Sequence, residues 1–235
     1  MTGPPAPHRP RLPRSRATRT RILEAARQVL GQDPDSGLGA IAEAAGVARR
    51  TVYVHFAGRA ALIEGLTAEA AEAVRLATAV SRTPHEHEHE HPDSDSHPDA
   101  DPATALARFV LTLWPVGDRY RTLIGLAHQD LGAQRVSELL APARDTVAEI
   151  LARGQHQGVF HAGVPSGPLS RALEAHLLAL LDSVKSGSWA DDGTSAATAA
   201  LIAAGVDTGV AASTVRRLRS TRGTRGARGT QPGTR

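Results

Sequence analysis

The sequence predicts an all-α protein, and two observations support this fold class. Aromatic residues make up only 3% of the 235 residues, so alanine and leucine must provide most of the packing, and these residues favour helices over sheets. Apolar residues also recur at helical spacing through most of the chain. With 41% hydrophobic residues, the chain is long enough to bury a sizeable core.

Charge is distributed unevenly, although the net charge is only +3. Residues 1–66 carry +5, residues 67–215 carry −9, and residues 216–235 carry +7. A basic N-terminal part beside an acidic body predicts a polyanionic partner for the first part. Cysteine is absent, which excludes disulfides and thiolate sites. We expect no membrane span and no secretory signal, and hence a cytoplasmic location.

The N-terminal residues predict a flexible arm followed by short helices. Residues 1–16 contain five prolines and are expected to form a disordered basic arm, which either reaches the minor groove or only aids solubility. Apolar spacing predicts a helix over 17–31. Ser36 can cap a second short helix, and Gly46 follows at the left-handed position that ends it. A third helix is expected over 48–56.

The remaining apolar periodicity predicts further helices over roughly 58–81, 103–113, 120–127, 133–155, 168–184 and 194–218. We expect Pro115 and Gly117 to end one of them and Pro142 to kink or break another. Residues 83–102 are polar, acidic and rich in proline, so they predict a disordered His/Asp-rich connection. The Arg/Gly tail at 219–235 is also expected to be disordered.

Residues 38–62 predict a helix, a tight glycine turn and a second helix. Ala42 and Ala45 are small enough for the two helices to cross closely. A second set of residues is expected to form the buried side, namely Ile41, Val47, Val52 and Phe56. The opposite side of the second of these helices carries Arg49, Arg50, Thr51, Val54 and His55. This pattern is typical of a helix-turn-helix, whose second helix enters the major groove of DNA.

The segments ILEAARQVL, IAEAAGV and TVYVHF–AGR–AAL closely resemble the N-terminal domain of TetR-family transcriptional regulators. The resemblance covers about residues 18–66. It implies a helix-turn-helix DNA-binding domain at 17–66 and a helical regulatory and dimerisation domain at 67–218. It further implies a regulator, usually a repressor, that binds a palindromic operator as a homodimer and is released by a small-molecule ligand.

The resemblance also implies which residues contact DNA. Ser36 and Ala48 occupy positions where the family often places phosphate-binding hydroxyls. Base edges are usually read at Arg49, Arg50 and Thr51, and the DNA backbone is touched at Tyr53 and His55. Arg59 replaces the usual phosphate-binding lysine.

Three positions depart from the family pattern, and the role of a fourth, Val54, has two possible interpretations. Ala48 cannot cap its helix, and Gly37 and Gly39 loosen the start of the preceding one. Val54 is either a surface apolar residue or a contact to a thymine methyl group.

The resemblance implies a ligand pocket in the second domain. Its candidate lining residues are the rings and imidazoles of Phe109, Trp114, Tyr120, His128 and His176, and the alternative is that they belong to an ordinary core. The last two helices carry much apolar surface, which predicts a four-helix dimer interface or, alternatively, a core within one chain.

Two other functions are alternatives to a ligand-responsive regulator. The alternating His and Glu residues within 85–97 suggest a metal-responsive loop, since imidazoles bind Zn, Ni or Cu, or a solvated linker. No metal ligand or cofactor is assigned. We find no nucleophile elbow, phosphate loop or zinc-protease motif, so we expect the protein not to be an enzyme, with a helical enzyme of unknown chemistry as the weaker alternative.

Overall fold

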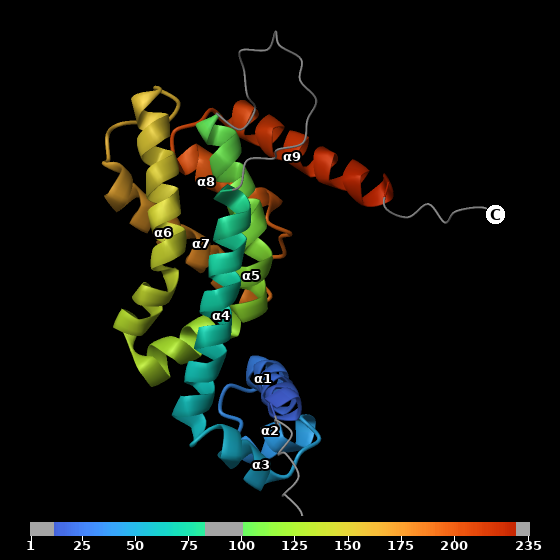
Figure 1. The fold of residues 1–235 in the computed structure, drawn as a ribbon. Helices are drawn as coiled ribbons and strands as arrows, with labels where there is room; N and C mark the ends of the chain where they lie inside the picture. Colours follow the sequence, from blue (N-terminus) through green and yellow to red (C-terminus); the bar gives the residue numbers. More distant parts are fainter. Residues whose placement is uncertain (1–11, 83–100, 229–235) are drawn as a thin grey trace, which may run out of the picture. The chain divides into compact units, whose positions relative to one another are not determined.

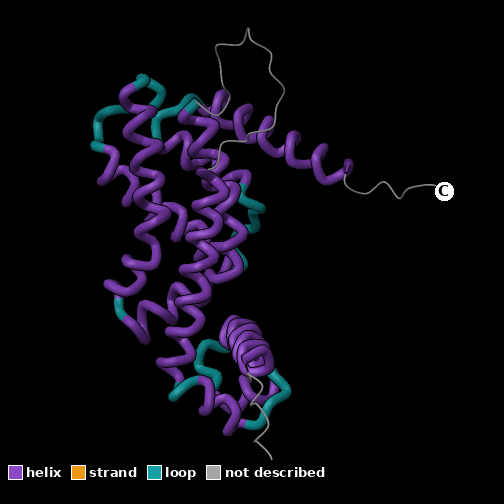
Figure 2. The backbone as a smooth tube through the Cα atoms, in the orientation of Figure 1, coloured by secondary structure: helices purple, strands orange, loops and turns teal. Residues whose placement is uncertain are grey.

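The computed structural model describes residues 12–82 and 101–228, which form helices joined by loops (Figures 1 and 2). The helices are α1 (Leu12–Gln32), α2 (Leu38–Ala44), α3 (Arg49–His55), α4 (Arg59–Arg82), α5 (Pro102–Leu131), α6 (Ala133–His156), α7 (Ser166–Lys185), α8 (Thr194–Ala203) and α9 (Thr208–Arg228). No strand occurs in this part of the chain, and the predicted all-α class is confirmed. None of the helices described there is long and apolar enough to cross a membrane.

The chain divides into two compact units. Among the described residues, the N-terminal unit comprises 12–69 and 122–136, and the C-terminal unit comprises 70–82, 101–121 and 137–228. The end of α5 and the start of α6 therefore belong to the same unit as α1, α2 and α3. Nothing in the apolar periodicity of residues 122–136 indicates this grouping.

The N-terminal unit has a small core of aliphatic side chains. Its largest fully buried members come from four helices, namely Ile22, Leu30, Ile41, Val52, Leu62, Ile63 and Leu66. α1 begins at Leu12, within the segment predicted to be a disordered arm. Proline is compatible with a first helical turn, where its missing N–H has no partner to lose, so Pro13 does not prevent this start.

The predicted capping role of Ser36 is wrong. Gly37 is the N-cap of α2, and no side chain caps that helix. The Ser36 hydroxyl instead donates to Oδ2 of Asp33 over 2.8 Å. The Asp33 carboxylate also accepts a hydrogen bond from the backbone N–H of Asp35 at 3.2 Å. The Ser36 hydroxyl is therefore hydrogen-bonded to the Asp33 carboxylate instead of capping α2.

The C-terminal unit is built around one apolar cluster, to which helices α4 to α9 contribute. α5 is continuous, so the predicted break at Pro115 and Gly117 is wrong. The proline inside the helix removes one backbone hydrogen bond. The burial of Val110, Leu111 and Trp114 in the core compensates for that loss. A Cβ atom at Gly117 would lie 2.8 Å from Cδ1 of Leu181. The glycine thus permits close helix packing rather than ending the helix. α6 also continues through Pro142.

The start of α5 and the chain's last helices differ from prediction. Asp101 caps α5 by accepting the N–H of Ala103 at 3.2 Å and that of Thr104 at 3.1 Å, so the predicted disordered connection ends earlier than 102. The single helix predicted over 194–218 is two helices, α8 and α9, because Gly205 takes a left-handed φ of 100°. α9 continues to Arg228, into the predicted disordered tail.

Candidate nucleic-acid interface

The turn between α2 and α3 is set by one glycine. Gly46 has a left-handed φ of 61°, which an L-residue with a Cβ atom adopts only at a cost. Its N–H donates to the carbonyl of Glu43 at 2.9 Å, and the N–H of Val47 donates to the carbonyl of Ala42 at 3.0 Å. This pair of bonds is the Schellman arrangement that ends a helix and redirects the chain. The predicted role of Gly46 is confirmed.

α3 is held in the N-terminal unit by its buried side. Val52 is 0% exposed, and Phe56, directly after the helix, is also buried. The Phe56 ring lies under the guanidinium of Arg19, 5.0 Å from its centroid, which is within the range of a cation–π contact. A Cβ atom at Gly65 would lie 2.8 Å from the same ring, so only a glycine fits there without a shift. The position of α3 is therefore set by packing.

The opposite side of α3 faces solvent. Arg49, Arg50, Tyr53 and Val54 are exposed, with Tyr53 at 48% and Val54 at 75%. The Arg49 guanidinium lies 5.8 Å from the centroid of the Tyr53 ring, one helical turn away. Arg50 has no hydrogen-bond or ion-pair partner among the described residues. The two guanidinium groups thus give this face a positive charge. No carboxylate among the described residues pairs with Arg50.

Three further predicted contacts border this face. Thr51 and His55 are half-buried at the sides of α3. Ala48 is the N-cap of α3 and makes no side-chain capping bond, as expected for alanine. The backbone N–H of Thr51 donates to the carbonyl of Ala48 at 2.8 Å. The structure therefore places Ala48, Thr51 and His55 next to the arginines in the same short segment.

Arg59 and Ser36 are joined to each other. Nη1 of Arg59 donates to the carbonyl of Ser36 at 3.1 Å, and Nη2 donates to the carbonyl of Pro34 at 2.7 Å. Nε of Arg59 lies 3.7 Å from Oδ2 of Asp130 in the last turn of α5. The predicted phosphate ligand thus fastens the α1–α2 loop to the start of α4. Sequence reasoning missed Asp130, since nothing in its local pattern points to Arg59.

The structure places the five predicted pocket residues in different surroundings. Phe109 and Trp114 belong to the core cluster of the C-terminal unit, and Tyr120 is also buried. His176 is exposed on α7, and His128, exposed in the N-terminal unit, has Nδ1 2.9 Å from the carbonyl of Ile124. A ligand pocket lined by these residues stays a prediction.

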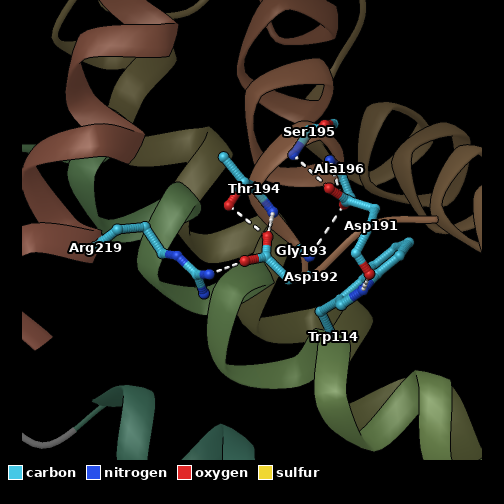
Figure 3. A network of polar contacts seen from close by, with 8 residues as sticks. All are labelled: Trp114, Asp191, Asp192, Gly193, Thr194, Ser195, Ala196 and Arg219. Carbon is cyan, nitrogen blue, oxygen red and sulfur yellow. Dashed lines mark hydrogen bonds and ion pairs between the residues drawn. The ribbon is translucent and has the colours of Figure 1, made fainter. Parts of the chain in front are cut away.

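Trp114 belongs to a polar network at the start of α8 (Figure 3). Its Nε1 donates to the carbonyl of Asp191 at 3.2 Å. The Asp191 carboxylate accepts the N–H groups of Gly193, Ser195 and Ala196 at 3.0, 3.0 and 3.1 Å, and so caps α8. The neighbouring Asp192 pairs with Arg219 of α9 and accepts the Thr194 hydroxyl. This network joins α5, α8 and α9 by hydrogen bonds and charge.

The metal-responsive alternative rests on residues 85–97, which lie outside the described residues. Within residues 12–82 and 101–228, no three His, Cys, Asp or Glu side chains gather closely enough to hold a metal ion. The described part of the chain therefore offers no observation in favour of a metal site.

Comparison with known proteins agrees with the geometry. Residues 22–66 match the family model of bacterial regulatory proteins, tetR family. No curated protein matches the chain. Among solved structures, the TetR-family regulator PfmR from Thermus thermophilus has a TM-score of 0.61 at 18% identity, covering 79% of this chain and 98% of that one.

Two further solved structures share the fold. LfrR from Mycobacterium smegmatis, solved with proflavine, is 24% identical with a TM-score of 0.58, covering 79% of this chain and 94% of that one. NalD, the secondary repressor of the MexAB-OprM multidrug efflux pump in Pseudomonas aeruginosa, is 23% identical with a TM-score of 0.53, covering 78% and 91%.

The N-terminal unit therefore has the architecture of a helix-turn-helix DNA-binding domain attached to a helical second unit. The predicted family is confirmed: the chain carries the TetR-family DNA-binding domain over residues 22–66, and its described part has the fold of TetR-family transcriptional regulators.

Proposed function

We propose that the protein is a repressor that binds a palindromic operator as a homodimer, through α3 of each subunit, and is released by a small molecule bound in the C-terminal unit. The exposed face of α3 carries this proposal. Two arginines and a tyrosine lie on the solvent side of a short helix whose other side is buried. Guanidinium groups donate in pairs to guanine O6 and N7 or to phosphate, which is the chemistry of a major-groove reader.

Roles within this face follow from side-chain chemistry. We assign base reading to Arg49, Arg50 and Thr51, and backbone contact to Tyr53 and His55. Ala48 offers phosphate only its backbone N–H, since its side chain has no donor. Ser36 and Arg59 act mainly by shaping the loop before α2, because the serine hydroxyl and the guanidinium already have partners within the protein.

The proposed homodimer would bind an operator with two-fold symmetry. Two copies would present two α3 helices, and half-sites about one helical turn apart, or a multiple of it, fit such a dimer. Leu177, Leu180 and Val184 on α7 are only partly buried in one chain, which leaves apolar surface for a second copy. A regulator of this kind acts on chromosomal DNA, so the expected cytoplasmic location belongs to the same proposal.

Release by a ligand is supported by analogy with LfrR, which was solved in complex with proflavine. A ligand lowers operator affinity only when it binds the released state more tightly than the DNA-bound state. Compounds made or removed by the products of genes beside the operator are the first to test. An operator affinity that none of them alters would contradict the ligand-release part of the proposal.

Selection from genomic DNA tests the main proposal. The purified protein is incubated with fragmented genomic DNA at about 150 mM salt, and the retained fragments are sequenced. We expect a short inverted repeat, lost for Arg50→Ala and Tyr53→Ala. Arg171→Ala, which removes an exposed arginine from α7, is the matched control and should retain the repeat. Recovery of DNA without a shared motif would contradict sequence-specific regulation.

A further inference from the structure

Val54 is unusual among the apolar side chains of the described residues. Its exposed fraction, 75%, is the largest of any large hydrophobic residue there. Single exposed apolar residues are ordinary on protein surfaces, so exposure alone decides nothing. The position of Val54 on α3 and its chemistry supply the rest of the argument.

Val54 lies at the centre of the solvent side of α3. The helix rotates by about 100° per residue. The direction opposite to the two buried residues, Val52 and Phe56, is therefore that of Val54. Arg50 lies one turn earlier on the same side. The residue at the centre of the proposed reading face thus carries neither a charge nor a hydrogen-bonding side chain.

Valine at this position does little for the fold. Its β-branched side chain has a lower helix propensity than alanine or arginine, and α3 is only seven residues long with no side-chain cap. Val54 also buries little apolar area within the chain. A residue that supports neither the helix nor the core is best explained by what it contacts outside the protein.

We propose that Val54 reads thymine in each operator half-site through the 5-methyl group. This inference rests on the proposed function, since it requires α3 to enter the major groove. Thymine is distinguished there by an apolar C5-methyl group, and unmodified cytosine has no such group. Valine has no donor or acceptor for the edges of guanine, adenine or cytosine. It therefore contributes to specificity only by apolar contact with this methyl group.

The test uses the inverted repeat recovered from genomic DNA. Duplexes are made in which each thymine of a half-site is replaced in turn by uracil, which removes only the methyl group. Kd is measured by fluorescence anisotropy at one fixed salt concentration. For the wild-type protein, we expect one position at which uracil weakens binding by about fourfold per half-site, the effect of about one buried methylene-sized group.

Variants then show which residue contacts that methyl group. Val54→Ala changes both subunits of the proposed homodimer, so it should bind the thymine duplex about fourfold more weakly per half-site, and it should no longer distinguish thymine from uracil. Alanine favours helix more than valine, so α3 is expected to remain formed. Val54→Thr keeps one γ-methyl group and should show an intermediate preference. Val80→Ala, the same change at a residue of α4 that is 64% exposed, should behave as wild type.

Three outcomes would overturn the inference while leaving the proposed function intact. These are a half-site without a methyl-dependent position, an undiminished preference for thymine in Val54→Ala, and a half-site that contains no thymine. Failure to recover any inverted repeat would instead overturn the proposed function, and the inference with it. The two failures are therefore distinguishable in one series of measurements.

Discussion

Arg59 and Asp130 are joined by an ion pair with 3.7 Å between Nε and Oδ2, although one begins α4 and the other lies in the last turn of α5. Both belong to the N-terminal unit. The same guanidinium donates to two carbonyls of the α1–α2 loop. The end of α5 is thereby connected through one arginine to the loop that precedes the helix-turn-helix.

This connection predicts unequal effects of two substitutions. Arg59→Ala removes both hydrogen bonds to the loop, so local stability should fall by about 1–2 kcal/mol. Asp130→Asn removes only a partly exposed ion pair, worth less than about 1 kcal/mol, and also removes a negative charge from a helix C-terminus, which is favourable. Amide hydrogen exchange of residues 35–45 should be about 5- to 30-fold faster for Arg59→Ala. Equal acceleration in both variants would contradict this interpretation.

The glycine turn predicts opposite effects at two nearby glycines. Gly46→Ala places a Cβ atom on a left-handed residue and should destabilise the N-terminal unit by about 1–2 kcal/mol. Gly46→Asn should lose less, because asparagine tolerates this conformation better. Gly39→Ala, within α2 and with no atom within 4 Å of its added Cβ, should stabilise the unit by about 0.5–1 kcal/mol. Urea unfolding monitored by circular dichroism measures the relative stabilities of the three variants. Loss of stability in Gly39→Ala would show that α2 is restrained in another way.

The contact of Gly193 with Trp114 predicts that alanine at Gly193 destabilises the protein more than alanine at Gly187. Gly193 and Gly187 both have positive φ, 96° and 73°, so alanine strains both. A Cβ atom at Gly193 would also lie 3.0 Å from Cγ of Trp114, whereas nothing lies within 4 Å of one at Gly187. Gly193→Ala should therefore lower the urea midpoint further than Gly187→Ala.

Tryptophan emission is a suitable measurement for that comparison. The chain has two tryptophans, Trp114 and Trp189, and their rings pack edge to face with centroids 6.2 Å apart in the C-terminal unit. Emission should shift as this pair separates during unfolding. Identical midpoints for the two glycine variants would mean that the Trp114 ring moves aside at no cost.

Sequence preference should separate base reading from backbone contact on α3. Arg50→Ala is expected to weaken operator binding by about 1–3 kcal/mol and to relax the preference at one base pair. His55→Ala should weaken binding to all sequences alike at every salt concentration, because a contact to the DNA backbone carries no sequence information. Anisotropy titrations over several salt concentrations, with operator and scrambled duplexes, give both quantities. A sequence-dependent effect of His55→Ala would reverse the assigned roles.

The N-terminal helices could be predicted from the sequence because their signals are local. Gly46 ends α2 as the pattern indicates, and Val52 and Phe56 are buried at the expected spacing. The assignment of DNA contacts remains a prediction, because it rests on the resemblance of residues 18–66 to a family of DNA-binding proteins.

The errors arise where contacts outside the helical spacing pattern decide the outcome. Pro115 and Gly117 are local signals for a helix end, but contacts such as that of Gly117 with Leu181 keep α5 continuous. Ser36 has the side chain of a helix cap, but the Asp33 carboxylate takes its hydroxyl. The partners of Arg59 come from a loop and from another helix, and no spacing rule brings them together. Sequence periodicity does not contain such information.

The burial of α3 has a consequence for how this domain can diverge. The residues that hold the helix, Val52 and Phe56, point inward, and those that face solvent, such as Arg50 and Val54, carry little of the packing. Substitutions on the outer side can therefore change which DNA is preferred at little cost to folding. New binding preferences become accessible by single steps through folded intermediates, so a duplicated copy of this chain can acquire a different target while its scaffold stays unchanged.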